Sequence, residues 1–315
     1  MNKKERARVI TLSVFLSLIL TSASPSALVV AATEHQAHEE YSQELQYFNG
    51  ERTVREKYLS VVKNKNTWNY SRYTINIRGS KISVQGFVSG GVYYIPFRAA
   101  ANALGMTYTY NSIAKTATMK GNGLTLIATD GCYSIYGNDR PLFSSSPAVI
   151  MNDGRMYVPI DAFAKAVGLG VNKGASSVSL NGNVKALTPA SSFYRDDEVL
   201  WLARIIHAES SGESLLGKIA VGNVVLNRVR SSSYPNTIYG VIFDRKYGVQ
   251  FSPVLNGTIY NTPSYESTLA AKICLEGFDI SEGALFFLHP EISSSSWIPN
   301  TRQYLFSIGA HDFYS

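Results

Sequence analysis

The clearest hydrophobic pattern in the chain predicts a buried helix that ends at a glutamate. Asp196 and Asp197 supply an N-cap and acidic first-turn residues. The positions from Val199 to Ala208 are then apolar almost all round, which is typical of a helix that is buried on every side. Glu209 follows directly, before a break in the pattern over residues 210–212.

A second helix is predicted after this break. Ser211 or Ser214 can cap it. Glu213 lies in its first turn, where the helix dipole favours the ionised carboxylate. The apolar positions of this helix are Leu215, Leu216, Ile219, Val221, Val224, Val225 and Val229.

Glu209 is the candidate for chemistry in this region. A carboxyl at the end of a buried helix is poorly solvated, and desolvation raises its pKa. A raised pKa suits a general acid that works near neutral pH. The alternative is that Glu209 is a helix-end residue that faces water. His207 is two residues away and points to a different helix face, so a Glu209–His207 pair is not expected.

The rest of the C-terminal region predicts short elements. Thr237 is a cap for a short helix over 238–243, and the alternating apolar residues over 245–257 predict a small β-hairpin. Residues 264–277 have helical spacing and end at a glycine. The segment ALFFLHP, from Ala284, predicts a buried strand, and further short strands follow it.

Residues 75–182 contain an internal repeat. Four pairs of residues match at one common offset of 63 positions: Gly91 and Gly154, Tyr94 and Tyr157, Pro96 and Pro159, and Gly105 and Gly168. Each unit predicts a turn, a short strand, a helix that ends at glycine, and a pair of strands. The region is therefore expected to be a separate α+β domain.

The N-terminal segment predicts export. Basic residues precede an apolar run from Val9 to Leu20, and small residues follow it. Residues 1–32 therefore predict a cleaved secretory signal peptide, with no stable membrane anchor after cleavage. An uncleaved anchor is the alternative, although the apolar run is short for one. Residues 33–74 predict a polar spacer, residues 183–193 a linker, and residues 194–315 a C-terminal domain.

Positive charge is concentrated in the repeat domain. The whole chain carries a formal net charge of +6. Residues 71–190 hold eleven basic and four acidic residues, whereas residues 191–315 hold nine basic and twelve acidic ones. This charge favours retention on an anionic polymer, and a solvated surface is the alternative. An exported chain without a nucleic-acid motif has no expected nucleic-acid partner.

No metal or cofactor is expected. Cys132 and Cys274 fall in different predicted domains and predict buried free thiols. The repeat domain contains no histidine, and the segment HAES, from His207, lacks the second histidine of a zinc protease motif.

Candidate ligand contacts lie in the C-terminal domain, on residues of the types that line carbohydrate clefts. A carbohydrate cleft needs flat apolar faces together with amides or hydroxyls, which Gln250, Phe251 and Ser252 can supply. Core packing is the alternative for Phe251 and for the further aromatic candidate, Trp297. The full set of predicted substrate-binding residues is Glu213, Thr237, Gln250, Phe251, Ser252 and Trp297.

The motifs of the C-terminal region resemble those of a known family. LARIIHAESSGES, from Leu202, and GKIAVGNVVLNRVRSSSYPNTIYGVIF, from Gly217, occur in the order found in bacterial spore-cortex-lytic cell wall hydrolases of the SleB/CwlJ type. The resemblance continues through Trp297-Ile298 to the segment IGAHDF, from Ile308. It implies a lysozyme-like, mainly helical domain with a small β-hairpin lobe. It also implies activity on peptidoglycan glycan strands, with Glu209 as the catalytic acid.

The repeat domain resembles the stalk-type domain named after the N-terminal domain of copper amine oxidases. This module is common in secreted proteins of Gram-positive bacteria, and its name implies no copper here. Asp161 stands where the second unit of the module usually has an arginine. The resemblance implies a role in wall anchoring rather than in chemistry.

The predicted fold class is α+β, with a two-repeat stalk domain before the lysozyme-like domain. The expected function is peptidoglycan cleavage by lytic transglycosylation between N-acetylmuramic acid and N-acetylglucosamine, because one carboxyl can act first as acid and then as base. The expected location is the spore cortex or cell wall of a Gram-positive-type bacterium. Two alternatives stay open, namely a hydrolytic muramidase that uses Glu209 and Glu213 and a wall-binding protein without activity.

Overall fold

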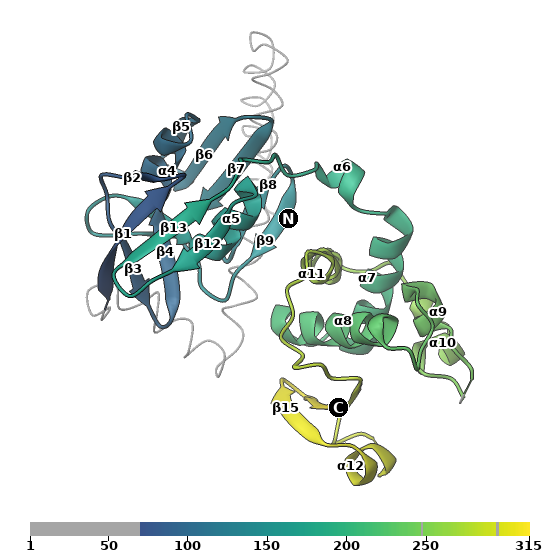
Figure 1. The fold of residues 1–315 in the computed structure, drawn as a ribbon. Coiled ribbons are helices and arrows are strands. Elements are labelled where there is room, and N and C mark those ends of the chain that lie inside the picture. Colours follow the sequence, from purple (N-terminus) through teal and green to yellow (C-terminus); the bar gives the residue numbers. More distant parts are fainter. Residues whose placement is uncertain (1–69, 247, 294–295) are drawn as a thin grey trace, which may run out of the picture.

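The computed structural model describes residues 70–246, 248–293 and 296–315. The predicted signal peptide and most of the predicted spacer lie outside these residues. A β-rich domain and a mainly helical C-terminal domain follow each other along the chain, joined by a segment that carries α6 (Ala190–Phe193) (Figure 1). The α+β class is therefore confirmed.

The two repeat units fold alike and pair with each other. In the first unit β4 (Val92–Pro96) leads into α4 (Phe97–Ala103), and in the second β11 (Met156–Pro159) leads into α5 (Ile160–Val167). The proline that ends each strand has no N–H to lose at the helix start. β4 and β11 are antiparallel neighbours, so the two units meet at equivalent strands. The predicted order of strand, helix and strand pair is confirmed in both units.

The strands of the β-rich domain form two sheets. The larger has the order β10-β11-β4-β3-β1-β13-β12, with β2 paired to β1, and the smaller has the order β5-β6-β7-β8-β9. The repeat pattern gives no indication of β7 to β10, which lie between the units in sequence. The remaining strand bounds are β1 (Ser71–Ile77), β2 (Ser80–Lys81), β3 (Gly86–Ser89), β5 (Thr107–Asn111), β6 (Thr116–Gly121), β7 (Leu124–Thr129), β8 (Ser134–Gly137), β9 (Arg140–Phe143), β10 (Val149–Ile150), β12 (Gly170–Lys173) and β13 (Ser177–Asn181).

The first strand of this domain begins earlier than the sequence predicts. β1 starts at Ser71, inside the segment predicted as a spacer, and Tyr73 is buried in the domain core. The boundary at residue 74 is therefore too late, because the last spacer residues already alternate between exposed and buried positions as a strand does.

Three helices build the core of the C-terminal domain. α7 (Asp196–Ser210) and α8 (Leu215–Arg230) are the two predicted helices, and α11 (Tyr265–Leu275) packs against both. Every residue from Leu215 to Leu226 is buried. α7 is less enclosed than the sequence predicts, because Leu200 is exposed. The buried side of α7 is formed by Leu202, Ala203, Ile205 and Ile206.

The helix caps differ in part from the prediction. Arg195 occupies the N-cap of α7 without a side-chain cap, and Asp196 and Asp197 are first-turn residues. Ser214 caps α8, since its Oγ accepts a hydrogen bond from the N–H of Gly217 at 3.1 Å. Of the two serines proposed for this cap, Ser214 is thus the correct one.

The small β-lobe lies nearer the C-terminus than predicted. β14 (Phe286–Leu288), β15 (Tyr304–Ile308) and β16 (His311–Tyr314) form an antiparallel sheet in the order β14-β16-β15. The predicted hairpin over 245–257 is wrong, because this segment contains α10 (Pro253–Asn256). Proline at the first helical position is compatible with a helix start.

The remaining short elements of the C-terminal domain are α9 (Ile238–Ile242), η1 (Thr258–Tyr260) and α12 (Trp297–Thr301). Within the described ranges, no helix combines the length and the apolar character that crossing a membrane requires.

A buried ion pair joins the two domains. Arg140 of β9 donates to both carboxylate oxygens of Glu276, just after α11, at 2.7 and 2.9 Å. Lys165 of α5 lies 3.0 Å from the same carboxylate. Tyr194, from the segment between the domains, donates its hydroxyl to it at 2.7 Å. A carboxylate of the helical domain is therefore held mainly by two cations of the β-rich domain.

Apolar contacts reinforce this junction. Tyr133 and Phe143 of the β-rich domain belong to the same buried cluster as the apolar residues of α7, α8 and α11. The rings of Phe143 and Phe278 meet edge to face with their centroids 4.7 Å apart. The domains are thus docked on each other. Cys132 and Cys274 are buried and form no disulfide among the described residues, as predicted.

Candidate active site

Glu209 lies in the last turn of α7 and is half-buried. Within the described residues no hydrogen bond or ion pair engages its carboxylate. Burial raises the pKa of Glu209 to about 7, and the positive charge of Arg228 opposes part of that rise. Near neutral pH a large fraction of Glu209 is therefore protonated, as a general acid requires.

Arg228, on α8, is the charged group that acts on Glu209, and sequence reasoning missed it. It is only 5% exposed, and its Nε donates to the carbonyl oxygen of Leu285 at 2.8 Å. Its guanidinium lies 5.2 and 5.0 Å from the ring centres of Tyr234 and Phe251. Its Nη1 is buried without a hydrogen-bond partner in the described structure. In the sequence Arg228 is one of several polar residues of α8, so no signal there marks it as the charge near Glu209.

This arrangement gives Arg228 an electrostatic role. A fixed, buried cation stabilises negative charge that develops nearby, and the protein interior strengthens the effect. Glu209 gains such a charge whenever it gives up its proton. Burial therefore strengthens the hold of Glu209 on its proton, and Arg228 weakens it in part.

Replacing Arg228 with methionine should raise the pKa of Glu209 further, because the opposing positive charge is lost. The shift should be up to about one pH unit. A general acid works while it is protonated, so the basic limb of the kcat/KM profile should move to higher pH. The profile of Arg230→Met, which removes an exposed cation from the same helix, should be unchanged. An unmoved limb in Arg228→Met would contradict the electrostatic coupling.

Lys218 holds the corner that carries Glu209. This lysine is only 1% exposed. Its Nζ donates to the carbonyl oxygens of Ser211 and Glu213 and lies 3.1 Å from the carboxylate of Glu266 on α11. The backbone between α7 and α8 is therefore fixed from inside by a paired charge.

Glu213 lies outside the position that the sequence predicts. α8 begins at Leu215 with Ser214 as its N-cap, so Glu213 precedes the first turn. Its carboxylate accepts hydrogen bonds from the N–H of Ala310 at 3.3 Å and lies 3.6 Å from Nδ1 of His311. The side chain is only 12% exposed. Glu213 therefore ties the helix corner to the turn between β15 and β16.

That turn is shaped around the Glu213 carboxylate. Gly309 has a φ of 58°, and a Cβ at this position would overlap with Oε2 of Glu213. Glycine is required on both counts. Burial lowers the pKa of His311, although the charge of Glu213 opposes this, so His311 is neutral at neutral pH.

Three predicted substrate-binding residues lie on or beside the short helices α9 and α10. The hydroxyl of Thr237 accepts from the N–H of Gly240 at 3.0 Å, which confirms Thr237 as the N-cap of α9. Gln250 donates its side-chain N–H to the carbonyl of Gly248 at 3.1 Å. Ser252 is exposed at the start of α10. Sugar binding by these residues stays a prediction.

The two aromatic candidates differ in exposure. Phe251 is buried in the helical core, which is the alternative given for it above. Trp297 is 52% exposed. Its ring meets that of Phe286 edge to face, with the ring centroids 5.8 Å apart. The guanidinium of Arg302 lies 5.1 Å from the ring centre of Trp297. Trp297 therefore keeps part of its ring free for a sugar, whereas Phe251 does not.

Comparison with known proteins gives two matched regions, which correspond to the β-rich domain and the C-terminal domain. Residues 212–314 match the Cell Wall Hydrolase family, and residues 74–180 match the copper amine oxidase N-terminal domain. The first match begins just after Glu209. The chain is 38% identical over 120 residues to a spore cortex-lytic enzyme of Bacillus cereus and 33% identical over 120 residues to one of Bacillus subtilis. Each alignment covers 38% of this chain, but only 45% and 38% of those relatives. The chain thus spans less than half the length of these curated relatives.

Among solved structures, the chain is similar to the catalytic domain of the germination-specific lytic transglycosylase SleB from Bacillus anthracis. The sequence identity is 37% and the TM-score is 0.36. The similarity covers 41% of this chain and 100% of that domain.

Proposed function

The C-terminal part of this chain belongs to the cell wall hydrolase family, and on that premise we propose that it cleaves peptidoglycan glycan strands by lytic transglycosylation. The names of the relatives, spore cortex-lytic enzymes and a lytic transglycosylase, support both the substrate and the reaction. Glu209 is the proposed catalytic acid, and the spore cortex is the proposed substrate.

In this reaction Glu209 acts twice. Its carboxylic acid first protonates the glycosidic oxygen between N-acetylmuramic acid and N-acetylglucosamine as the bond from this oxygen to C1 breaks. The resulting carboxylate then accepts the proton of the muramic C6 hydroxyl, whose oxygen attacks C1 and closes a 1,6-anhydro ring. No water enters the product, and Glu209 ends protonated. A pKa of about 7 suits both steps.

The position of Glu213 is the observation that favours lytic transglycosylation over hydrolysis. A hydrolytic glycosidase ordinarily uses two carboxyl groups, one as acid and one as base or nucleophile. Glu213 is the acidic residue nearest to Glu209 in the sequence. Its carboxylate is engaged by Ala310 and lies beside His311. Because Glu213 is committed to the C-terminal turn, the arrangement favours a reaction that needs Glu209 alone.

The products should therefore end in anhydromuramic acid. Mass spectrometry of digested sacculi should show fragments one water lighter than those released by a hydrolytic muramidase from the same sacculi. Glu213→Gln should give the same anhydro products, because glutamine can still accept the Ala310 hydrogen bond. Reducing muramic ends from the wild type that disappear in Glu213→Gln would instead support the paired-carboxylate hydrolase. An intact, folded protein that releases nothing would support the wall-binding alternative.

The β-rich domain is proposed to retain the enzyme on the wall. Its excess of basic residues favours an anionic polymer. The proposed location is the cell wall or spore envelope of a Gram-positive-type bacterium, which agrees with the organisms of the named relatives.

A further inference from the structure

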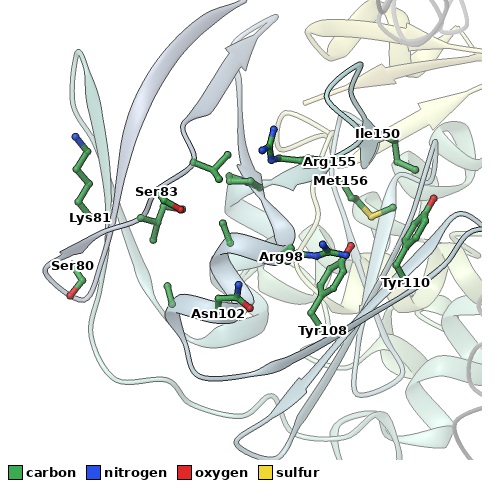
Figure 2. Close-up of a pocket in the computed structure, with 16 residues that line it drawn as sticks. Ser80, Lys81, Ser83, Arg98, Asn102, Tyr108, Tyr110, Ile150, Arg155 and Met156 are labelled. Atoms are coloured by element: carbon green, nitrogen blue, oxygen red, sulfur yellow. The ribbon is translucent and has the colours of Figure 1, made fainter.

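The β-rich domain contains a cavity of about 520 Å³ on the side of the first repeat unit (Figure 2). Four segments line it: β2 with the loop that follows, α4, β5, and the hairpin of β10 and β11. Figure 2 shows Lys81 and Ser80 on one side of the hollow and Tyr110, Met156 and Ile150 on the other. Its volume is typical of sites for small ligands, about 300–1,000 Å³.

The lining of this cavity is cationic. Among the described residues, Lys81, Arg98 and Arg155 line it, and no acidic residue does. Arg155 is paired with Asp153 at 3.0 Å. Lys81 and Arg98 have no acidic partner within the described residues. Two exposed cations without a counter-charge favour an anionic ligand.

The remaining lining groups are those of a sugar site. The guanidinium of Arg98 lies 4.6 Å from the ring centre of Tyr108, which restrains its position. Tyr110 is exposed, so a flat face is available to a ring of the ligand. Ser80 and Asn102 add a hydroxyl and an amide that can bind polar groups.

The second repeat unit provides an internal comparison. At the offset of 63 positions, Arg98 corresponds to Asp161 and Tyr110 to Lys173. These two residues form an ion pair with each other at 2.8 Å. Asn102 corresponds to Lys165, which is engaged by Glu276 at the domain junction. The equivalent face of the second unit is thus used internally, whereas the first unit leaves its face open.

We propose that this cavity binds a carboxylate-bearing oligosaccharide, namely a peptidoglycan fragment with free carboxylates on its peptide stem. The guanidinium and ammonium groups match the carboxylates, and the tyrosines match the sugar rings. The choice of peptidoglycan rests on the proposed function. Since the two domains are docked through the Arg140–Glu276 contact, the cavity keeps a fixed place relative to Glu209.

Binding can be measured on the full chain with Glu209→Gln, which separates binding from cleavage. The probe is a purified disaccharide tetrapeptide, titrated by calorimetry at physiological ionic strength. Lys81→Gln with Arg98→Gln should weaken binding at least about tenfold, since hydrogen bonds to charged groups are lost. Lys115→Gln with Lys185→Gln removes the same charge from exposed sites outside the cavity. This control should change the affinity less than about twofold.

Hydrogen exchange locates the bound probe, and protection is expected over residues 80–84 and 98–103. Equal losses of affinity in the two double variants would overturn the proposal, because the probe would then be held by the overall positive charge of the domain and not by the cavity. Undiminished binding of the methyl-esterified probe, or no binding at all, would also overturn it. Tighter binding of a glycerol phosphate oligomer would assign the cavity to a phosphate polymer instead. None of these outcomes depends on the products of cleavage, so failure here and failure of the proposed function can be told apart.

Discussion

Glu209→Gln should lower the rate of peptidoglycan cleavage by about 10²–10⁴-fold, the usual effect of losing a general acid. Glutamine keeps the shape of the side chain but has no proton to donate to the leaving oxygen. Release of anhydromuramic fragments from sacculi measures the effect. Glu266→Gln is a useful comparison, because Glu266 pairs with Lys218 behind the same corner. It can reduce stability, but it does not remove the acid.

Glu209→Gln should not destabilise the protein at neutral pH. Burial raises the pKa of Glu209 from its ordinary value to about 7. Stability from this carboxyl is therefore fully present below the ordinary glutamate pKa of about 4.3 and is lost as the pH rises towards 7. Glutamine cannot ionise, so above pH 7 the variant should unfold at the same or a higher temperature than the wild type. An inactive variant that is also less stable there, or a stable variant with normal activity, would contradict the assignment.

Glu276→Gln should lower the free energy of unfolding by about 3–5 kcal/mol, because it leaves a buried guanidinium without its counter-charge. Arg140 is almost fully buried and donates to both oxygens of Glu276. Urea denaturation followed by circular dichroism measures the loss. The two domains should also separate in unfolding, which converts one transition into two. Glu291→Gln removes an exposed carboxylate from the same domain and should change stability by less than about 0.5 kcal/mol.

The pH dependence offers a second readout of the same contact. Although burial opposes it, hydrogen bonds from Arg140, Tyr194 and Lys165 hold the pKa of Glu276 below its ordinary value. The stability from this carboxylate is present above the ordinary pKa and is lost as the pH falls through the folded-state value. The gap between wild type and Glu276→Gln should therefore narrow in acid. A gap that does not change with pH, or no gap at all, would show that the ion pair does not hold the domains together.

The sequence predicts the repeat units and main helices well because their patterns are local. Proline before each helix and glycine after it delimit α4 and α5, and the apolar run from Leu215 delimits α8. The prediction of a hairpin over 245–257 was wrong because its local pattern is ambiguous. Alternation over so few residues is compatible with several structures, and Pro253 begins α10 there. The domain junction is also invisible in the sequence, because Arg140 and Glu276 are 136 residues apart.

The residues of the candidate site also differ in whether the sequence alone can predict their role. Glu209 stands out in the sequence because a carboxyl follows an apolar run, and its raised pKa follows from that position. The position of Glu213 cannot be predicted from the sequence, because its partner Ala310 is 97 residues away in the chain. Arg228 was missed because nothing in the sequence of α8 shows that its charge acts on Glu209. Residues that act across long sequence separations need the structure.

Synthesis delivers the Gly309–His311 turn to Glu213 only after 97 further residues have been added to reach Ala310. Until then the Glu213 carboxylate has no turn to bind, and the corner that holds Glu209 is incomplete. N-terminal domains generally fold first as a chain emerges, so the β-rich domain can form while the C-terminal domain is still unfinished. The corner that carries Glu209 is therefore completed only when the turn between β15 and β16 has been synthesised.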